Sequence, residues 1–207
     1  MTMASESSYV IYGMRESGNC YKLKLLMRHL NIAYQWREID IFKGESQTEE
    51  YRAKNSVGEV PLLQFPDGSY LAQSNAILFY LAQGSSYYFD DKRLAAEILQ
   101  WMFFEQYSHE PYIAVARKIK KLLPADHPDN QKMPELEKRG YHALTIMQQH
   151  LSKHEYFVAD KYSIADISLY AYTHIAEEGG FELDAYPSIL RWMDDIRAQV
   201  GYVAMYE

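Results

Sequence analysis

"VGEVPLLQFPDGSYLAQSNAILFYLAQG", residues 57–84, combines two short strand patterns, a turn and a helix pattern. Its Pro-Asp-Gly sequence is a turn signal between apolar runs at 61–65 and 69–71, so this part of the chain is predicted to form a β-hairpin. Apolar residues at helical spacing follow the hairpin. Ser74 is a possible N-cap of that helix and Gly84 a stop signal.

Upstream of this stretch, the patterns predict a β-α-β unit. "SYVIYGM", residues 8–14, has the composition of a buried strand, and residues 20–32 carry one apolar helical stripe. Residues 34–41 alternate between apolar and polar side chains, which indicates a second strand, parallel to the first. With a polar, helix-compatible stretch at 47–54, the predicted order up to Gly84 is β-α-β-α-β-β-α.

Beyond residue 84 the sequence shows only helical patterns. They cover residues 92–121, 134–154, 164–178 and 187–199. The predicted fold is therefore an α/β N-terminal domain followed by an all-α helical domain. The expected boundaries are a flexible N-terminus at 1–7, the α/β domain at 8–84, a linker at 85–91 and the helical domain at 92–207.

Two local features of the helical half have specific structural consequences. Pro111 lies inside the first long helical pattern and should kink or break it. Ser163 and Asp166 have the spacing of a capping box at the start of a later helix. We interpret this pair as structural rather than catalytic.

The composition excludes several classes of function. The 207 residues carry a formal net charge of −7, and no basic block is present, which argues against nucleic acid. No window is long and apolar enough to span a membrane or to act as a secretion signal. The single cysteine, Cys20, cannot form an internal disulfide. A cytoplasmic location is expected.

Four segments together resemble a known family. They are "SGNCYKLKLL" at 17–26, "VGEVPLL" at 57–63, "AQSNAILFYL" at 72–81 and "YSIADISLYAY" at 162–172. In this order and spacing they are similar to the cytosolic glutathione transferases, with a thioredoxin-like N-terminal half and a helical C-terminal half. The first segment looks like the serine-type helix start of the phi, tau and zeta classes.

The resemblance implies a glutathione site in the α/β half. Val60, before a cis Pro61, would pair its main chain with the cysteinyl part of glutathione. Gln73 and Ser74 stand where a helix begins, and the free N–H groups there favour an anion such as the γ-glutamyl carboxylate. Pro61 could instead only open a strand, and Ser74 could only cap its helix.

Two cations precede the cis-proline segment. Arg52 and Lys54 are candidates for binding the glycyl carboxylate of glutathione. A solvated helix face is the competing interpretation of both residues.

Three residues compete for the role of thiolate stabiliser or thiol. Four residues separate Ser17 from the basic Lys22, as in the serine-type classes, and Ser17 is the first choice. Cys20 aligns with the cysteine of the bacterial beta class, but a lone buried cysteine is usually inert. Tyr12 resembles the tyrosine of the alpha, mu and pi classes, and Asn19 is retained as an assistant.

A pocket for the second substrate is expected on the long helix after the linker. Its candidate lining residues are Tyr107, His109, Tyr112 and Arg117, each of which could instead belong to the core or the surface. His150 and His154 have the i,i+4 spacing of a metal pair but no accompanying third ligand, so no metal is expected.

The function implied by the resemblance is a glutathione transferase of the detoxification type. Glutathione would be the co-substrate, a small hydrophobic electrophile the second substrate, and the protein a homodimer. Two alternatives remain: a glutathione-dependent disulfide or peroxide reductase that uses Cys20, and a non-catalytic interaction module of the same fold.

Overall fold

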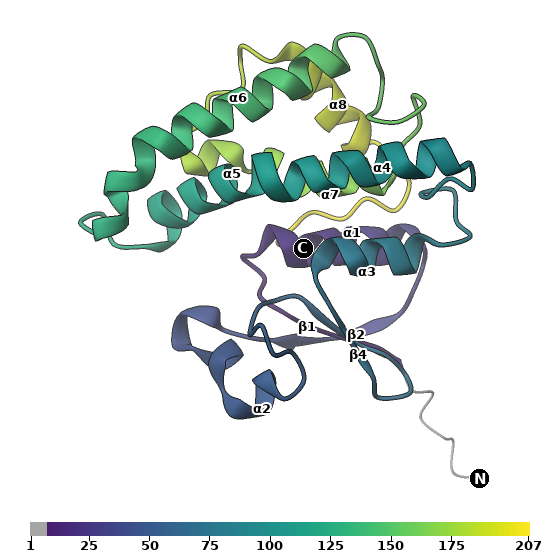
Figure 1. The fold of residues 1–207 in the computed structure, drawn as a ribbon, viewed down its shortest axis with the longest axis vertical. Helices are drawn as coiled ribbons and strands as arrows, with labels where there is room; N and C mark the ends of the chain where they lie inside the picture. Colours follow the sequence, from purple (N-terminus) through teal and green to yellow (C-terminus); the bar gives the residue numbers. More distant parts are fainter. Residues whose placement is uncertain (1–7) are drawn as a thin grey trace. The chain divides into compact units, whose positions relative to one another are not determined.

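The computed structural model describes residues 8–207, in two compact units (Figure 1). The described part of the first unit comprises residues 8–81 and the C-terminal segment Val203–Glu207, and the second unit is Ala82–Tyr202. The predicted flexible N-terminus, 1–7, lies outside the described residues.

The first unit contains a four-stranded mixed sheet in the order β2-β1-β3-β4. Strand β1 (Tyr9–Gly13) pairs in parallel with β2 (Tyr34–Glu38), and antiparallel with β3 (Leu62–Gln64), which forms a hairpin with β4 (Tyr70–Ala72). This topology confirms the predicted thioredoxin-like α/β fold and its hairpin. In the Pro-Asp-Gly turn of this hairpin, Gly68 has a left-handed φ of 88°, a conformation that glycine adopts without strain.

Helices cover both faces of this sheet. Helix α1 (Gly18–His29) and helix α3 (Ser74–Ala82) lie on one face, and the short α2 (Glu49–Arg52) lies on the other (Figure 1). The apolar stripe predicted for α1 is inside the protein, where Leu23 and Leu26 are fully buried. Burial of these side chains stabilises the helix on the sheet by about 2 kcal/mol for each leucine.

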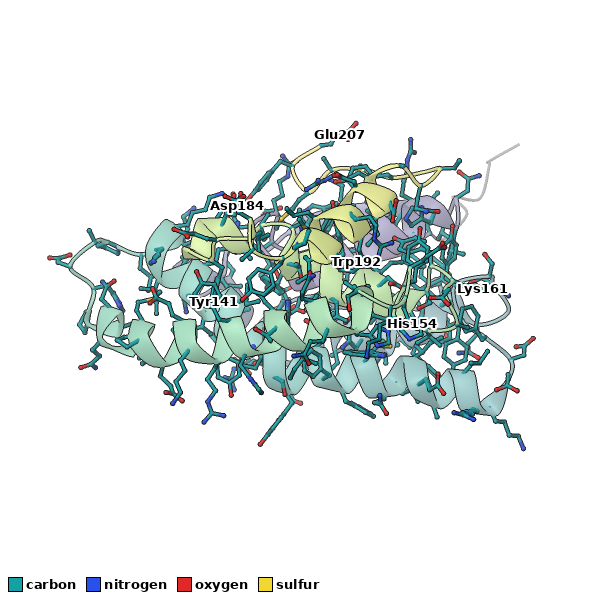
Figure 2. The ribbon with its side chains drawn as sticks, turned by 90° about the horizontal axis from the view of Figure 1, so that it is seen from above. Tyr141, His154, Lys161, Asp184, Trp192 and Glu207 are labelled. Carbon is teal, nitrogen blue, oxygen red and sulfur yellow. The ribbon has the colours of Figure 1, made fainter. Side chains whose placement is uncertain are left out.

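The second unit is all helical, as predicted. Its helices are α4 (Lys92–Phe104), α5 (Glu110–Arg117), α6 (Met133–Leu151), α7 (Ile164–Thr173) and α8 (Pro187–Arg197). Every residue of α7 is buried, because α4 and α5 both pack against it. Helix α6 packs against α5 and α8, and the fully buried ring of Trp192 of α8 (Figure 2) packs against Phe157 and against Tyr170 of α7.

The predicted capping box is confirmed at the start of α7. Ser163 Oγ accepts from a backbone N–H of the first turn, and Asp166 Oδ2 accepts from Ser163 N at 2.9 Å. Asp166 Oδ1 also accepts from Phe157 N at 3.1 Å and from Trp192 Nε1 at 3.0 Å. The same carboxylate therefore caps α7 and ties it to α8, which supports the structural interpretation.

Two helix predictions differ from the structure. The run predicted at 92–121 is not broken at Pro111; a π-helical turn, Glu105–His109, joins α4 to α5. A proline has no N–H and its ring crowds the carbonyl four residues earlier, and the wider turn accommodates both effects. The helix predicted at 164–178 ends earlier, at Thr173, and a 3₁₀ turn at Ala176–Gly179 follows.

Candidate functional site

The N-termini of α1 and α3 are joined by a side-chain hydrogen bond. Ser17 is the N-cap of α1, and its Oγ accepts from Cys20 N at 3.3 Å. Ser74 is the first residue of α3, and its Oγ donates to Asn19 Oδ1 at 3.1 Å. Two sets of free backbone N–H groups, each with a partial positive charge, therefore occur close together in the first unit.

A lysine of α1 adds a full positive charge to this arrangement. Lys22 is fully buried, and its Nζ lies 3.4 Å from Ser74 Oγ and 3.4 Å from Asn75 Oδ1. We did not predict Lys22 as a site residue. The signal was present in the sequence, since Asn19 and Lys22 have the i,i+3 spacing that places two side chains on one helical face.

The chain passes from β4 into α3 through one unusual residue. Gln73 has a φ of 72°, which is rare outside glycine, and its carbonyl accepts from Ile77 N at 3.0 Å. Gln73 thus occupies the N-cap position, so the prediction that Ser74 is the N-cap is wrong. The left-handed conformation of Gln73 redirects the chain from β4 into α3 at a single residue. The Ser74 hydroxyl does not cap the helix and instead donates to Asn19 Oδ1.

The peptide bond between Val60 and Pro61 is cis, which confirms the predicted isomer. The segment before it is fixed by two donors to one carbonyl oxygen. Tyr51 Oη and Asn55 Nδ2 both donate to Glu59 O, each at 2.8 Å. Asn55 is buried, so the backbone leading to the cis bond is held by a satisfied polar contact.

Cys20 lies beneath the start of α1 and is fully buried. Its Sγ accepts from Met14 N at 3.4 Å, and the Trp36 ring packs close by across Gly13. Burial raises the pKa of the Cys20 thiol to about 12, although a hydrogen bond with Ser17 and the Met14 N–H act in the opposite direction. The thiol is therefore protonated at neutral pH and has no exposed surface.

Tyr12 lies in the core. It packs in a buried cluster with Val10, Tyr51 and Leu62. Its hydroxyl donates to Gln64 Oε1 at 3.0 Å. The Tyr12 hydroxyl is thus engaged within the sheet and does not take part in the contacts at the start of α1.

The two cations proposed for the glycyl carboxylate lie at or just beyond the end of α2. Arg52 is exposed, and its guanidinium donates to Gln47 Oε1. Lys54 Nζ pairs with Glu50 at 2.6 Å and lies 5.6 Å from the centre of the Tyr12 ring. The hydrogen bond to Glu50 raises the pKa of Lys54. Neither residue contacts the α1 and α3 termini.

The four residues predicted for a second-substrate pocket differ in their surroundings. Tyr107 is 82% exposed, whereas His109 is fully buried with its Nε2 at 2.9 Å from Thr173 Oγ1. Arg117 is buried and pairs with Glu178 at 2.6 Å. The ring of Tyr112 lies beneath the Arg139 guanidinium. The second unit thus does not gather these four side chains around one cavity.

Comparison with known proteins identifies the family. The family model described as "Glutathione S-transferase, N-terminal domain" matches residues 7–83, and that of the C-terminal domain matches residues 95–199. The chain belongs to the glutathione S-transferase family. The two matched ranges cover most of the chain, so the resemblance predicted from the four segments is confirmed.

The relatives of this chain carry names that indicate different functions. A glutathione S-transferase structure from Pseudomonas fluorescens Pf-5 has 49% identity and a TM-score of 0.93, covering 97% of this chain and 100% of its own. A probable glutathione S-transferase of Oryza sativa is 27% identical over 91% of both chains. The disulfide-bond oxidoreductase YfcG of Escherichia coli is 24% identical, over 87% of this chain and 86% of its own.

Two further features are absent from the described residues, 8–207. No group of three or more His, Cys, Asp or Glu side chains is arranged to hold a metal ion. Within the same range, the helices include none that is both long and apolar enough to cross a membrane.

Proposed function

We propose that this protein is a glutathione transferase in which Ser17 stabilises the glutathione thiolate. The observation that carries the proposal is the hydrogen bond from Ser74 Oγ to Asn19 Oδ1. It holds the start of α1, where a hydroxyl is available, next to the start of α3, where an anion is favoured. Glutathione carries both groups that two such termini could bind, a thiol and a carboxylate.

Anion binding is assigned to the start of α3. The γ-glutamyl carboxylate would accept from the backbone N–H of Ser74, and Gln73 would bind the ammonium group through its amide oxygen. Lys22, whose Nζ lies near Ser74 and Asn75, adds positive potential at this position. Val60 would bond the cysteinyl main chain, and Arg52 and Lys54 are kept for the glycyl carboxylate.

Thiolate formation is the task of the start of α1. A free thiol has a pKa of about 8.5, so only a few per cent is ionised at neutral pH. Ser17 Oγ accepts from Cys20 N and also hydrogen-bonds the Cys20 thiol; in the complex, its proton would be donated to the glutathione sulfur instead. One such bond to an anion stabilises it by about 1.5–3 kcal/mol, and the helix terminus adds about 0.3–1 kcal/mol.

The reaction then needs no further cofactor. The thiolate sulfur attacks an electrophilic carbon, a sulfur–carbon bond forms, and the leaving group departs with the electron pair of its bond. The thiol proton has already passed to solvent. We assign the glutathione site to residues 8–84 and the second-substrate pocket to the helical domain, 92–207.

The two alternative functions find less support in the site. A reductase using Cys20 would need an accessible thiolate, whereas this thiol is fully buried and its pKa is raised to about 12. A non-catalytic module would have no need of the polar contacts among Asn19, Lys22 and Ser74. The similarity to YfcG keeps the reductase as the competing outcome of the test below.

A cytoplasmic homodimer completes the proposal. Large apolar side chains are exposed on α3, on α4 and in the π-helical turn after it: Phe79, Tyr80, Phe103 and Tyr107. Phe103 is 69% exposed and Tyr107 is 82% exposed, at the i,i+4 spacing that makes one face. Exposed apolar side chains on one helical face, such as Phe103 and Tyr107, commonly mark a protein interface.

Isothermal titration calorimetry with glutathione tests the binding site. We expect a Kd of about 0.1–1 mM for the wild type and at least about tenfold weaker binding for Ser74→Ala. Ser85→Ala, which changes a serine just after α3, is the control and should bind like the wild type. Turnover of 1-chloro-2,4-dinitrobenzene would then show transferase chemistry. Absence of glutathione binding at about 10 mM would contradict the proposal.

A further inference from the structure

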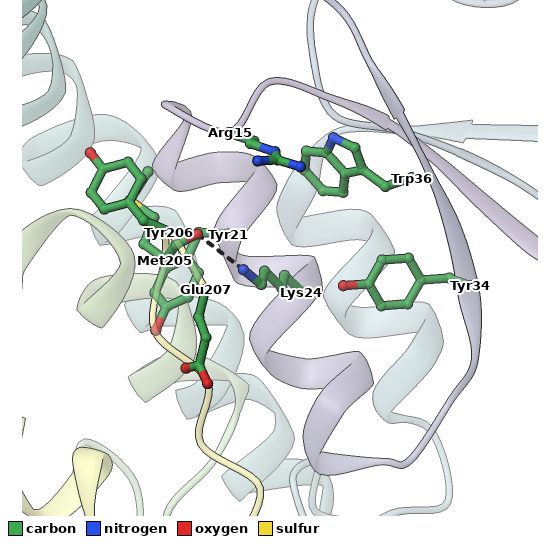
Figure 3. Close-up of a pocket in the computed structure, with 8 residues that line it drawn as sticks. All are labelled: Arg15, Tyr21, Lys24, Tyr34, Trp36, Met205, Tyr206 and Glu207. Atoms are coloured by element: carbon green, nitrogen blue, oxygen red, sulfur yellow. Dashed lines mark hydrogen bonds between the residues drawn. The ribbon is translucent and has the colours of Figure 1, made fainter.

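The first unit contains a cavity apart from the residues assigned above to glutathione. Its volume is about 210 Å³, it is partly open to solvent, and it is lined by the start of α1, strand β2 and the C-terminal segment (Figure 3). The lining residues are Arg15, Tyr21, Lys24, Tyr34, Trp36, Met205, Tyr206 and Glu207. Ser17 and Ser74, to which the thiolate and the anion are assigned above, are not among them.

One wall of the cavity is the C-terminal segment, which is hydrogen-bonded to α1. Lys24 Nζ donates to Ala204 O at 3.2 Å and to Met205 O at 3.1 Å. Tyr21 Oη donates to Val203 O at 2.8 Å. These three bonds come from one helical face and fix the segment opposite β2, so the cavity has defined walls.

Two cations face the cavity. The Lys24 ammonium has two of its three N–H donors on carbonyl oxygens, which leaves a third donor. Burial lowers the pKa of Lys24, Glu207 opposes this, and the nearby charge of Arg15 adds to the lowering. Among residues 8–207, the Arg15 guanidinium has only a 3.9 Å ion pair with Glu38, and its side chain is 76% exposed. An anion between the two cations would reduce their mutual repulsion.

The Glu38 and Glu207 carboxylates near the cavity have other partners. Glu207 Oε2 accepts from Ala204 N at 3.1 Å. Glu38 Oε2 accepts from Trp36 Nε1 at 2.6 Å, and its Oε1 accepts from Arg15 N at 3.0 Å. Glu38 also pairs with Arg15 Nε at 3.9 Å, so an incoming anion would use the third donor of Lys24 and the exposed part of the Arg15 guanidinium.

Aromatic rings form much of the remaining surface. Tyr34 and Trp36 are two residues apart on β2, so both point to the same face of the strand. Figure 3 shows Arg15 beside the Trp36 indole and the Tyr34 hydroxyl pointing toward Lys24. Aromatic faces and edges prefer another ring as a partner, by about 0.5–1.5 kcal/mol beyond area burial.

The volume limits the size of the ligand. Sites for drug-sized ligands usually exceed about 300 Å³, whereas a dry cavity of about 150 Å³ can hold a benzene ring. A cavity of about 210 Å³ therefore has room for one ring with one small substituent. We propose that it binds a one-ring aromatic carboxylate, with the carboxylate between Lys24 and Arg15 and the ring against Trp36 and Tyr34.

The test uses benzoate as the probe and fluorine NMR as the readout. Protein labelled with 5-fluorotryptophan gives one signal for each of its three Trp residues, and Trp36→Phe assigns the signal of Trp36. Benzoate should shift that signal with saturation below about 10 mM, and it should do so with saturating glutathione present. Benzamide, which has the ring without the charge, should bind at least about fivefold more weakly.

Variants at Lys24 test whether its positive charge is responsible for benzoate binding. Lys24→Met should weaken benzoate binding at least about fivefold, and Lys24→Arg, which keeps the charge, should stay within about twofold of the wild type. Arg93→Gln, an exposed cation of the second unit, is the control. The proposal is overturned if the Trp36 signal does not move, if Lys24→Met weakens binding less than fivefold, or if benzamide binds as well as benzoate. It does not rest on the proposed transferase function.

Discussion

Replacement of Ser17 by alanine should change the pH dependence of turnover in a calculable way. Suppose that the site lowers the glutathione thiol pKa from about 8.5 to about 6.5, which needs about 2.7 kcal/mol. If the Ser17 hydroxyl contributes about 2 kcal/mol of this, Ser17→Ala raises the thiol pKa by about 1.5 units, to about 8.0. The thiolate fraction at pH 7 then falls from about three quarters to about one tenth.

The expected loss in rate is therefore about eightfold at pH 7, and it should shrink to less than about 1.5-fold at pH 9, where both thiols are ionised. The assay is the rate with 1-chloro-2,4-dinitrobenzene at saturating glutathione from pH 5.5 to 9.5. The thiolate absorbance of the bound glutathione, followed over the same range, should give the same two pKa values.

A matched control separates thiolate stabilisation from helix capping. Thr48 Oγ1 caps α2 by accepting from Tyr51 N at 3.3 Å, the same distance as the bond from Cys20 N to Ser17 Oγ. Thr48→Ala should cost about 1 kcal/mol of stability, as Ser17→Ala does through its cap, without moving the pH profile. The reasoning is refuted if Ser17→Ala keeps the wild-type profile, or if the rate deficit persists unchanged at pH 9.

Three further predictions concern single residues. Cys20→Ala should keep the rate of glutathione conjugation within about twofold of the wild type. The native Cys20 thiol is buried and its pKa is raised, so it should react with Ellman's reagent only after unfolding. Fast labelling of the folded protein would contradict this prediction. Lys22→Met should raise the KM for glutathione about five- to tenfold, because it removes a positive charge next to the proposed carboxylate site. The control, Lys161→Met at an exposed position, should leave the KM unchanged. A KM for Lys22→Met equal to that of the wild type would show that Lys22 is not part of the site. Asp166→Ala leaves four donors, from Phe157, Ser163 and Trp192, without their acceptor. The free energy of unfolding, measured by urea titration, should fall by at least about 3 kcal/mol. A loss below about 1 kcal/mol would contradict the role of Asp166 as a cap.

Local patterns were sufficient to predict several elements of both units. The apolar stripe of α1, the Pro-Asp-Gly turn and the capping box at Ser163 depend on residues close in sequence, and all three are present. Each combines a spacing with a side-chain chemistry that only one local structure satisfies. At Pro111, where the sequence predicts a kink or a break, the helix is not broken, and a π-helical turn stands before the proline.

The side-chain environment of the site depended on contacts distant in sequence. Lys22 meets Ser74 across 52 residues, and no local pattern predicts that contact. The same limit applies to His109 and Arg117, which the helical spacing left open between cleft and core and which the structure buries. The C-terminal segment belongs to the first unit through bonds to Lys24 and Tyr21, which helical periodicity does not reveal.

The most direct test is a crystal structure of the protein with glutathione bound. The central claim predicts the glutathione sulfur within about 3.5 Å of Ser17 Oγ and the γ-glutamyl carboxylate at the backbone N–H of Ser74. A sulfur nearest to Cys20 Sγ, or bound in a mixed disulfide with it, would contradict the claim and identify the protein as a thiol reductase.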